Sequence, residues 1–246
     1  MSRAFGWKGY IPDIRAKKYA YSTLAKTVEV PNVKYGWSAP QLDQGNLGSC
    51  GPHAYVELFY TSMRQNELEP ILLSPLDLYY SYRKHTNEID FDSGVYNRLM
   101  LDIAATIGVC SFDDWPTDND KWDTAPPAGL KRYKMKAYHE VDTSNLDEIL
   151  NCLSEGYNFI TGIPVYQSFE DAEDGIVPLP QKGDKFLGGH DILIQGFDRY
   201  LKIFYGQNHW KNWGFEGRAY VGSCHFTLPF GYKDYMADSW TITLTE

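Results

Sequence analysis

The stretch Gln44-Gly45-Asn46-Leu47-Gly48-Ser49-Cys50-Gly51-Pro52 joins a glycine-rich turn to the start of a predicted helix. Pro52 suits the first helical turn, because the amide N–H that it lacks would have no partner there. At a helix N-terminus, the macrodipole and the unpaired N–H groups favour the thiolate form of Cys50, which is a nucleophile. The local sequence therefore predicts either a catalytic cysteine or an inert cysteine in a capping turn. The buried face of the helix is expected at Ala54, Leu58 and Met63.

A catalytic thiol needs an oriented base, and His190 is the first candidate. It follows Gly188 and Gly189 and begins a strongly apolar predicted strand. Asn208 follows the next predicted strand, and its side-chain oxygen could hold the imidazole and fix its tautomer. Trp210 could shield that hydrogen bond from water, although a tryptophan in a turn usually only packs. These positions predict a cysteine on a helix that faces a histidine on a strand.

Two residues near Cys50 complete the set of candidates. The side-chain amide of Gln44 could join the Cys50 backbone N–H as a donor to an oxyanion. His53 is the competing base, because it lies three residues from Cys50 on the same helix face. Side chains lean toward the helix N-terminus, so we interpret His53 as a packing residue. No CxxC pair or histidine cluster predicts a metal site, and the remaining cysteines are expected to be buried thiols: Cys110, Cys152 and Cys224.

Composition excludes several classes of protein. The 246 residues carry a formal charge of −9, which argues against a general nucleic-acid binder. Hydrophobic residues make up 43% of the chain, enough for a folded core. No run approaches the ~18 apolar residues of a membrane span, and the opening Met1 to Ala20 does not resemble a secretory signal. We therefore expect an acidic intracellular, cytoplasmic protein without a disulfide scaffold.

The predicted elements change in character along the chain. Residues 1–45 read as an extended surface arm, with one short strand near Thr27 to Val30. Helices are predicted first and strands later, which indicates an α+β fold. A proline-rich stretch at Ala125 to Gly129 is the candidate subdomain boundary. Besides the helix at Cys50, we expect helices from Ser74, over 96–107 and over 145–155, and antiparallel strands over 159–163, 191–195, 202–205, 219–221 and 239–244.

The motifs together resemble the papain-like (C1) cysteine peptidases. The matching words are Gln44 to Cys50, Gly189-His190, Asn208-His209-Trp210 and Trp213-Gly214. The opening Gly6-Trp7 to Arg15 resembles compact prokaryotic and viral members without a long propeptide. The likeness spans nearly the whole chain.

The resemblance implies one papain-like domain over 1–246: an arm (1–45), a mainly helical subdomain (46–130) and a mainly β, barrel-like subdomain (131–246). It implies an endopeptidase with Cys50 as nucleophile, His190 as base, Asn208 as orienting residue and Gln44 as oxyanion donor. Peptide or protein substrates would bind in the cleft between the subdomains, without cofactor, metal, nucleic acid or membrane. The substrate contacts implied are Gly94, Gly189 and Trp210.

Several residues depart from the family pattern. Asp191 takes a usually small, apolar position, where its charge either raises the pKa of His190 or points to the other face of the strand. Gly51 replaces an aromatic residue, and His209 replaces the usual serine. The acidic run Glu170 to Asp174 either favours basic substrates or is simply solvated. Two other functions stay open: an acyl transferase or ligase, and a catalytically silent protein of this fold that binds peptides or has a structural role.

Overall fold

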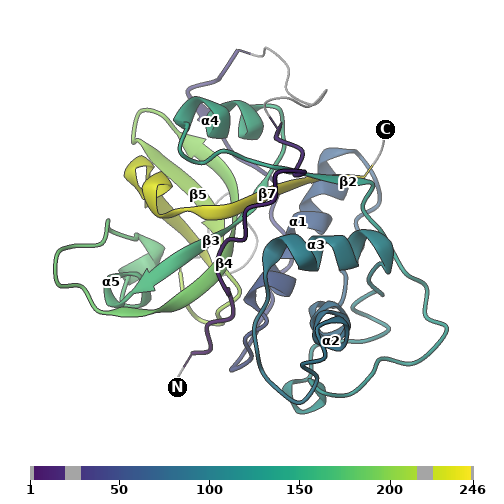
Figure 1. The fold of residues 1–246 in the computed structure, drawn as a ribbon. Coiled ribbons are helices and arrows are strands. Elements are labelled where there is room, and N and C mark those ends of the chain that lie inside the picture. Colours follow the sequence, from purple (N-terminus) through teal and green to yellow (C-terminus); the bar gives the residue numbers. More distant parts are fainter. Residues whose placement is uncertain (1–2, 20–28, 215–223, 245–246) are drawn as a thin grey trace.

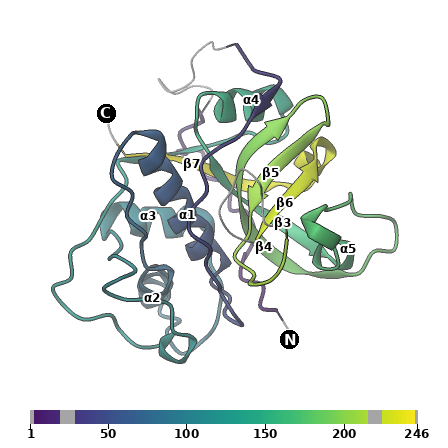
Figure 2. The ribbon, with the colours of Figure 1, turned by 180° about the vertical axis from the view of Figure 1, so that it is seen from behind.

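The computed structural model describes residues 3–19, 29–214 and 224–244. It is an α+β fold in which three helices pack beside an antiparallel sheet (Figure 1). Helix α1 (Cys50–Gln65) lies against strand β4 (Phe186–Asp198), and α2 (Pro75–His85) and α3 (Asn97–Thr106) lie farther from the sheet (Figure 2). The α+β class predicted from the sequence is confirmed.

Helix starts follow local chemistry. Pro52 lies in the first turn of α1, as predicted. Ser74 caps α2 by accepting a hydrogen bond from the Asp77 N–H at 3.1 Å, and Pro75 holds the first helical position. The smaller helices are α4 (Leu146–Ser154) and α5 (Gln167–Glu170), with 3₁₀ turns η2 (Asn119–Lys121), η3 (Glu173–Gly175) and η4 (Phe230–Tyr235). No described helix is long and apolar enough to cross a bilayer.

The described strands form one antiparallel sheet in the order β2-β7-β3-β4-β5-β6, with β1 paired to β4. Strand β4 is central, because it pairs with β3, β5 and β1 and is buried over most of its length. The other strands are β1 (Val33–Lys34), β2 (Ala137–Glu140), β3 (Phe159–Tyr166), β5 (Ile203–Gln207), β6 (His225–Pro229) and β7 (Ala237–Thr243).

The sheet carries a hydrophobic core on each face. Leu193 of β4 packs with the helices α1–α3, whereas its neighbours Ile192 and Ile194 pack on the other face with α4 and aromatic side chains. This alternation is the period-two pattern of a strand buried on both sides, which explains the continuous apolar run in the sequence. Because the sheet is fixed from both sides, β4 is a rigid support for His190.

The sequence predicted most of these elements and missed some. All four long helices and the strands β3, β4, β5 and β7 are present where the patterns indicated. Strands β2 and β6 were not expected. The strand predicted near Thr27 to Val30 lies half outside the described residues, and its described half, 29–30, is not a strand; β1 is Val33–Lys34 instead. The strand predicted over 219–221 lies wholly outside the described residues. The first residues of the arm, 3–8, lie partly buried in the groove between the helices and the sheet, as described next.

Candidate active site

Cys50 is the first residue of α1 and is fully buried. The preceding turn is held by the carboxylate of Asp92, whose oxygens accept hydrogen bonds from the Gly48 N–H at 2.9 and 3.0 Å. The Cys50 thiol donates a long hydrogen bond of 3.8 Å to Asp191 Oδ2. The nucleophile candidate is thus positioned by a helix start and a braced turn, and it faces a carboxyl group.

The thiolate expected from the helix position is not favoured in this arrangement. Burial raises the pKa of Cys50 strongly, and the charge of Asp191 raises it further. Backbone N–H groups of Asp191, Gly6 and Gly51 act in the opposite direction but are outweighed. The helix terminus supplies donors as predicted, yet desolvation decides the protonation state, so Cys50 is a neutral thiol here.

His190 and Asn208 form the predicted pair. The His190 Nε2–H donates to Asn208 Oδ1 at 2.8 Å, and the His209 N–H donates to the same oxygen at 2.9 Å. His190 Nδ1 has no hydrogen-bond partner among the described residues. Burial and the neighbouring His209 hold the pKa of His190 well below its usual value. The ring is therefore a fixed neutral imidazole with one nitrogen left to act as a base.

Trp210 and Gln44 enclose this pair. The Trp210 ring stacks on His190, with 4.4 Å between centroids, and its Nε1–H donates to Gln44 Oε1 at 3.2 Å. That bond orients the Gln44 amide, whose Nε2 donates to the carbonyl oxygens of Leu47 at 2.7 Å and Ala4 at 3.2 Å. Trp210 thus covers one face of the His190 ring, and Gln44 presents an N–H donor to a carbonyl in the cleft.

The Ala4 carbonyl belongs to a segment of the arm, residues 3–8, that we call the N-terminal segment. Figure 1 shows it running between the helices and the sheet. The Val95 N–H donates to Gly6 O at 2.7 Å, the Lys8 N–H donates to Val95 O at 2.9 Å, and the Trp7 N–H donates to Gly189 O at 3.1 Å. The segment is bound as an extended peptide between α3's leading loop and β4, and it covers Cys50.

The three predicted substrate contacts all touch this segment. Gly94 adopts a φ of 71°, and a Cβ there would lie 2.1 Å from Gly6 O. Gly189 accepts the Trp7 N–H, and the Arg3 guanidinium lies over the Trp210 ring at 4.4 Å. Gly94, Gly189 and Trp210 therefore line the groove in which a peptide backbone already lies.

Asp191 takes the second of the two orientations considered from the sequence. Successive residues of a strand point to opposite faces, so Asp191 lies on the face opposite His190. Its Oδ1 accepts a hydrogen bond of 2.6 Å from Asn97 Nδ2, which also donates to the Asp238 carbonyl oxygen at 3.3 Å. Sequence reasoning missed Asn97 and Asp238, because no local motif connects them to Cys50.

His53 packs as predicted and does not act on the thiol. Its Nδ1–H donates to Ser49 O at 2.8 Å, and its ring lies 5.3 Å from that of His209. Burial lowers the pKa of each of these histidines to about 3. Behind them, Glu57 is buried 3.6 Å from His209 Nδ1. The other cysteines are buried, as expected: Cys110, Cys152 and Cys224.

The acidic run over 170–174 divides between its two expected roles. Glu170 forms an ion pair with Arg3 of the N-terminal segment at 3.2 Å, so it borders the cleft. Asp171, Glu173 and Asp174 are exposed, as a solvated loop would be. Only one carboxylate of the run can therefore influence a bound peptide directly.

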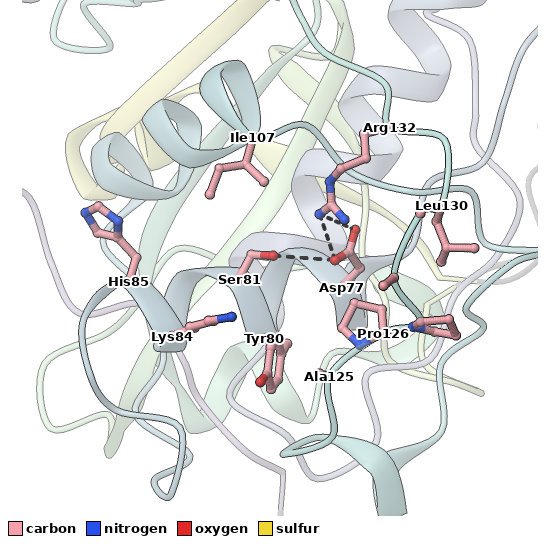
Figure 3. A pocket seen from close by; sticks show the side chains of 13 residues that line it. Asp77, Tyr80, Ser81, Lys84, His85, Ile107, Ala125, Pro126, Leu130 and Arg132 are labelled. Atoms are coloured by element: carbon pink, nitrogen blue, oxygen red, sulfur yellow. Dashed lines mark hydrogen bonds and ion pairs between the residues drawn. The ribbon is translucent and has the colours of Figure 1, made fainter.

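A separate cavity of about 520 Å³ lies between α2 and residues 125–130 (Figure 3). Asp77 in its wall is fully paired, because it accepts from Arg132 Nη2 at 2.8 and 2.9 Å and from the Cys110 N–H at 2.8 Å. None of the predicted catalytic residues lines this cavity. Among the described residues, no cluster of histidine, cysteine or carboxylate side chains could hold a metal ion.

No protein-family model matches the chain. It is 28% identical over 238 residues to an uncharacterized peptidase C1-like protein of Acanthamoeba polyphaga mimivirus, covering 89% of this chain and 73% of that protein. Xylellain, a cysteine protease from Xylella fastidiosa, has a similar crystal structure: the TM-score is 0.80 at 26% identity, over 100% of this chain and 99% of the other. Procathepsin B S9 of Trypanosoma congolense matches at a TM-score of 0.76 and 12% identity, over 99% and 87%.

Proposed function

Because the chain has the fold of the papain-like (C1) cysteine peptidases and is homologous to them, we propose that it is a cysteine endopeptidase that hydrolyses peptide bonds. The observation that carries the proposal is the His190 Nε2–Asn208 Oδ1 hydrogen bond of 2.8 Å. It leaves Nδ1 as the basic atom of a buried imidazole. Cys50 at the start of α1 supplies the thiol.

The reaction follows an acyl-enzyme route. His190 Nδ1 takes the proton of the Cys50 thiol as Sγ attacks the substrate carbonyl carbon. The tetrahedral intermediate collapses, the amine leaves with the proton from His190, and the acyl group stays on sulfur. His190 then takes a proton from water as the water oxygen attacks the thioester carbonyl carbon. The C–S bond breaks to release the acid, and His190 returns the proton to the Cys50 sulfur. Asn208 holds the ring in one orientation throughout.

Gln44 and the helix start stabilise the oxyanion. The Gln44 Nε2 donates to the Ala4 carbonyl oxygen in the cleft, so this donor is already oriented toward a peptide carbonyl. The Cys50 backbone N–H at the helix start is the second donor. Removing one such donor typically lowers the rate by about 10²–10³-fold.

A substrate reaches Cys50 only when the N-terminal segment moves away. Cys50 has no exposed surface while residues 3–8 occupy the groove. The group of Gly6 that faces the Cys50 sulfur is its backbone N–H, not its carbonyl carbon. The segment therefore occupies the groove without presenting a bond to attack. Opening it also restores water to Cys50 and His190, which favours the reactive ion pair.

The alternative is a silent protein that binds peptides, and the neutral, covered thiol is the observation that favours it. A peptide probe with a thiol-reactive group separates the two functions. We expect it to label Cys50 and none of the three packing cysteines, and to label the His190→Ala variant far more slowly. Equal labelling of all four cysteines would contradict the peptidase proposal.

Product analysis separates hydrolysis from acyl transfer. The chain is incubated with a peptide substrate and an excess of a primary amine, with Cys50→Ala as the control. A peptidase gives mainly the free acid, whereas a transferase or ligase gives the amide.

A further inference from the structure

Two backbone strips line the groove on the side of the helices. One is the turn before Cys50, at Gly48, and the other is the loop before α3, at Gly94 and Val95. Both contact Gly6 of the N-terminal segment: a Cβ on Gly6 would lie 1.9 Å from Gly48 O, and a Cβ on Gly94 would lie 2.1 Å from Gly6 O. The Val95 N–H also donates to Gly6 O at 2.7 Å. A peptide backbone at the thiol is therefore held between these two strips.

One carboxylate and one hydroxyl join the two strips. The Gly48 N–H donates to both oxygens of Asp92, at 2.9 and 3.0 Å. Oδ1 of the same carboxylate also accepts a hydrogen bond from the Tyr79 hydroxyl. The Tyr79 oxygen in turn accepts the Gly94 N–H at 3.0 Å. We call this chain of hydrogen bonds, from Gly48 through Asp92 and Tyr79 to Gly94, the Asp92 clamp.

Tyr79 gives the clamp a rigid base. It lies in α2 and is fully buried in the core that the helices share. Burial raises the pKa of Tyr79, and the hydrogen bond to Asp92 raises it further. The hydroxyl therefore stays protonated, so it donates to the carboxylate while its oxygen accepts the Gly94 N–H.

The clamp is compact because Gly48 has no side chain. A Cβ on Gly48 would lie 3.1 Å from Asp92 Oδ1, and 3.4 Å from both the Tyr79 oxygen and the Gly94 nitrogen. The turn, the carboxylate and the loop thus meet at one point. The clamp fixes the distance between the two strips at the place where the peptide backbone passes.

The turn that the clamp holds also carries the proposed oxyanion donors. Gly48 lies two residues before Cys50, whose backbone N–H is one donor. The Gln44 Nε2, the other donor, is bonded to Leu47 O at 2.7 Å, next to Gly48. A displacement of the turn would move both donors relative to a substrate held by the other strip. A misplacement of about 1 Å can lower a rate about 100-fold.

We infer that Asp92 and Tyr79 are positioning residues, which hold the turn with the oxyanion donors at a fixed distance from the strip that binds the peptide backbone. The inference rests on the proposed peptidase function for its effect on catalysis. The link between the two strips is a property of the folded chain that exists with or without catalysis.

Amide hydrogen exchange, measured by NMR on the isotope-labelled chain, tests the link without catalysis. Each variant is compared at the N–H that it does not bond directly. Asp92→Ala leaves the acceptor of the Gly94 N–H in place, and Tyr79→Phe leaves the acceptor of the Gly48 N–H in place. We expect the exchange of that distant N–H to be about tenfold faster or more in each variant, because the link opens as one unit. Effects confined to the directly bonded N–H in both variants would overturn the inference.

Steady-state kinetics tests the positioning role. The N-terminal segment competes with substrate for the groove, so it alters KM and leaves kcat at saturating peptide unchanged. Asp92→Ala should lower kcat about 10- to 100-fold. Asp92→Asn keeps Oδ1, the oxygen that accepts from both Gly48 and Tyr79, and should restore most of the rate. Asp90→Ala is the matched control, because Asp90 is an exposed carboxylate of the same loop. An unchanged kcat in folded Asp92→Ala would overturn the inference.

Two reagents separate positioning from general damage to the site. A peptide aldehyde forms a bond between its carbonyl carbon and the Cys50 sulfur, and its oxygen, which gains the thiol proton, lies at the oxyanion donors. Iodoacetamide alkylates the same sulfur, releases iodide and needs no such donor. Both reagents require an open cleft, so the ratio of aldehyde affinity to alkylation rate removes any change in opening. Asp92→Ala should lower this ratio about tenfold or more, and an unchanged ratio would overturn the positioning role.

The outcomes keep the two proposals separate. Exchange that spreads across the link in a chain that hydrolyses no peptide would contradict the peptidase function and leave the clamp intact. Hydrolysis with a kcat insensitive to Asp92→Ala would overturn the positioning role and leave the peptidase function intact. Tyr79→Phe gives the same readings if Asp92→Ala does not fold. Its control is Tyr80→Phe, because Tyr80 lines the separate cavity (Figure 3).

Discussion

Trp7→Ala should raise peptidase activity, because Trp7 anchors the N-terminal segment over Cys50. The substitution removes the Nε1–H···Asp238 hydrogen bond of 3.2 Å and the packing of the indole against Gly162. A hydrogen bond to a charged group contributes about 1.5–3 kcal/mol, and burial of the partly buried Trp7 indole adds about 1 kcal/mol. Together they amount to about 3 kcal/mol, or roughly a hundredfold in the equilibrium between the covered and open cleft.

The increase in activity is expected in kcat/KM. The apparent affinity for substrate is reduced by the fraction of molecules whose cleft is open, and Trp7→Ala raises that fraction. The assay is hydrolysis of a fluorogenic peptide, normalised to the concentration of reactive thiol. We expect an increase of up to about 100-fold, with the ceiling reached when the cleft is fully open. Melting temperatures of the variants verify that the fold is kept.

Trp37→Ala is the matched control. Trp37 also belongs to the arm but is 46% exposed, and it stacks on Arg64 at 4.6 Å, outside the N-terminal segment. Its substitution should leave kcat/KM unchanged. If folded Trp7→Ala is no more active than the unmodified chain, the segment does not limit access and the reasoning from Cys50 burial fails.

Three further outcomes are expected. Asp191→Asn lowers the pKa of the Cys50 thiol by up to about three units, because a charge 3.8 Å away corresponds to about 4 kcal/mol at an effective dielectric of about 20. Thiolate ultraviolet absorbance, corrected with Cys50→Ala, measures this, and an unchanged titration would mean that the carboxylate does not act on sulfur. Asn208→Ala lowers kcat by roughly 10- to 100-fold, the effect of one hydrogen bond of about 1.5–3 kcal/mol, whereas His190→Ala abolishes turnover. Steady-state kinetics measures both effects. Equal kcat values for Asn208→Ala and the unmodified chain would refute an orienting role. His53 has a pKa lowered from 6.5 to about 3 by burial, so stability is present above pH 6.5 and is lost as pH falls toward 3. His53→Gln should flatten this loss in melts recorded across that range, and the same slope in both proteins would exclude His53 as its source.

Local chemistry made much of the fold predictable. Ser74 and Pro75 fix the start of α2 through a cap and a missing N–H, and these effects depend only on neighbouring residues. The apolar run of β4 predicted a buried strand for the same reason. Strand β2 was missed, since Ala137–Glu140 is short and half-buried at one end of the sheet and carries no strong period.

The candidate site divides in the same way. The candidates Gln44, Cys50, His190 and Asn208 could be predicted from turns, a helix start and strand ends. The structure brings His190 and Asn208 within hydrogen-bond distance. The protonation state of Cys50 could not be predicted from the sequence, because it depends on burial under the N-terminal segment and on the Asp191 carboxyl group, 141 positions away in the chain.

The sequence by itself determined the starts of the long helices and the burial of the central strands, and it singled out the candidate nucleophile and base. Caps, prolines and side-chain periodicity act over a few residues, so they can be read without the fold. Only the tertiary structure decided that Asp191 points away from His190, and that Trp7 reaches Asp238, 231 positions later in the chain. Such pairs are created by strand register and by the path of the arm between the helices and the sheet. The cluster of Trp7, Asn97, Asp191 and Asp238 therefore exists only in the folded chain, where side chains from four separate segments converge near the Cys50 thiol.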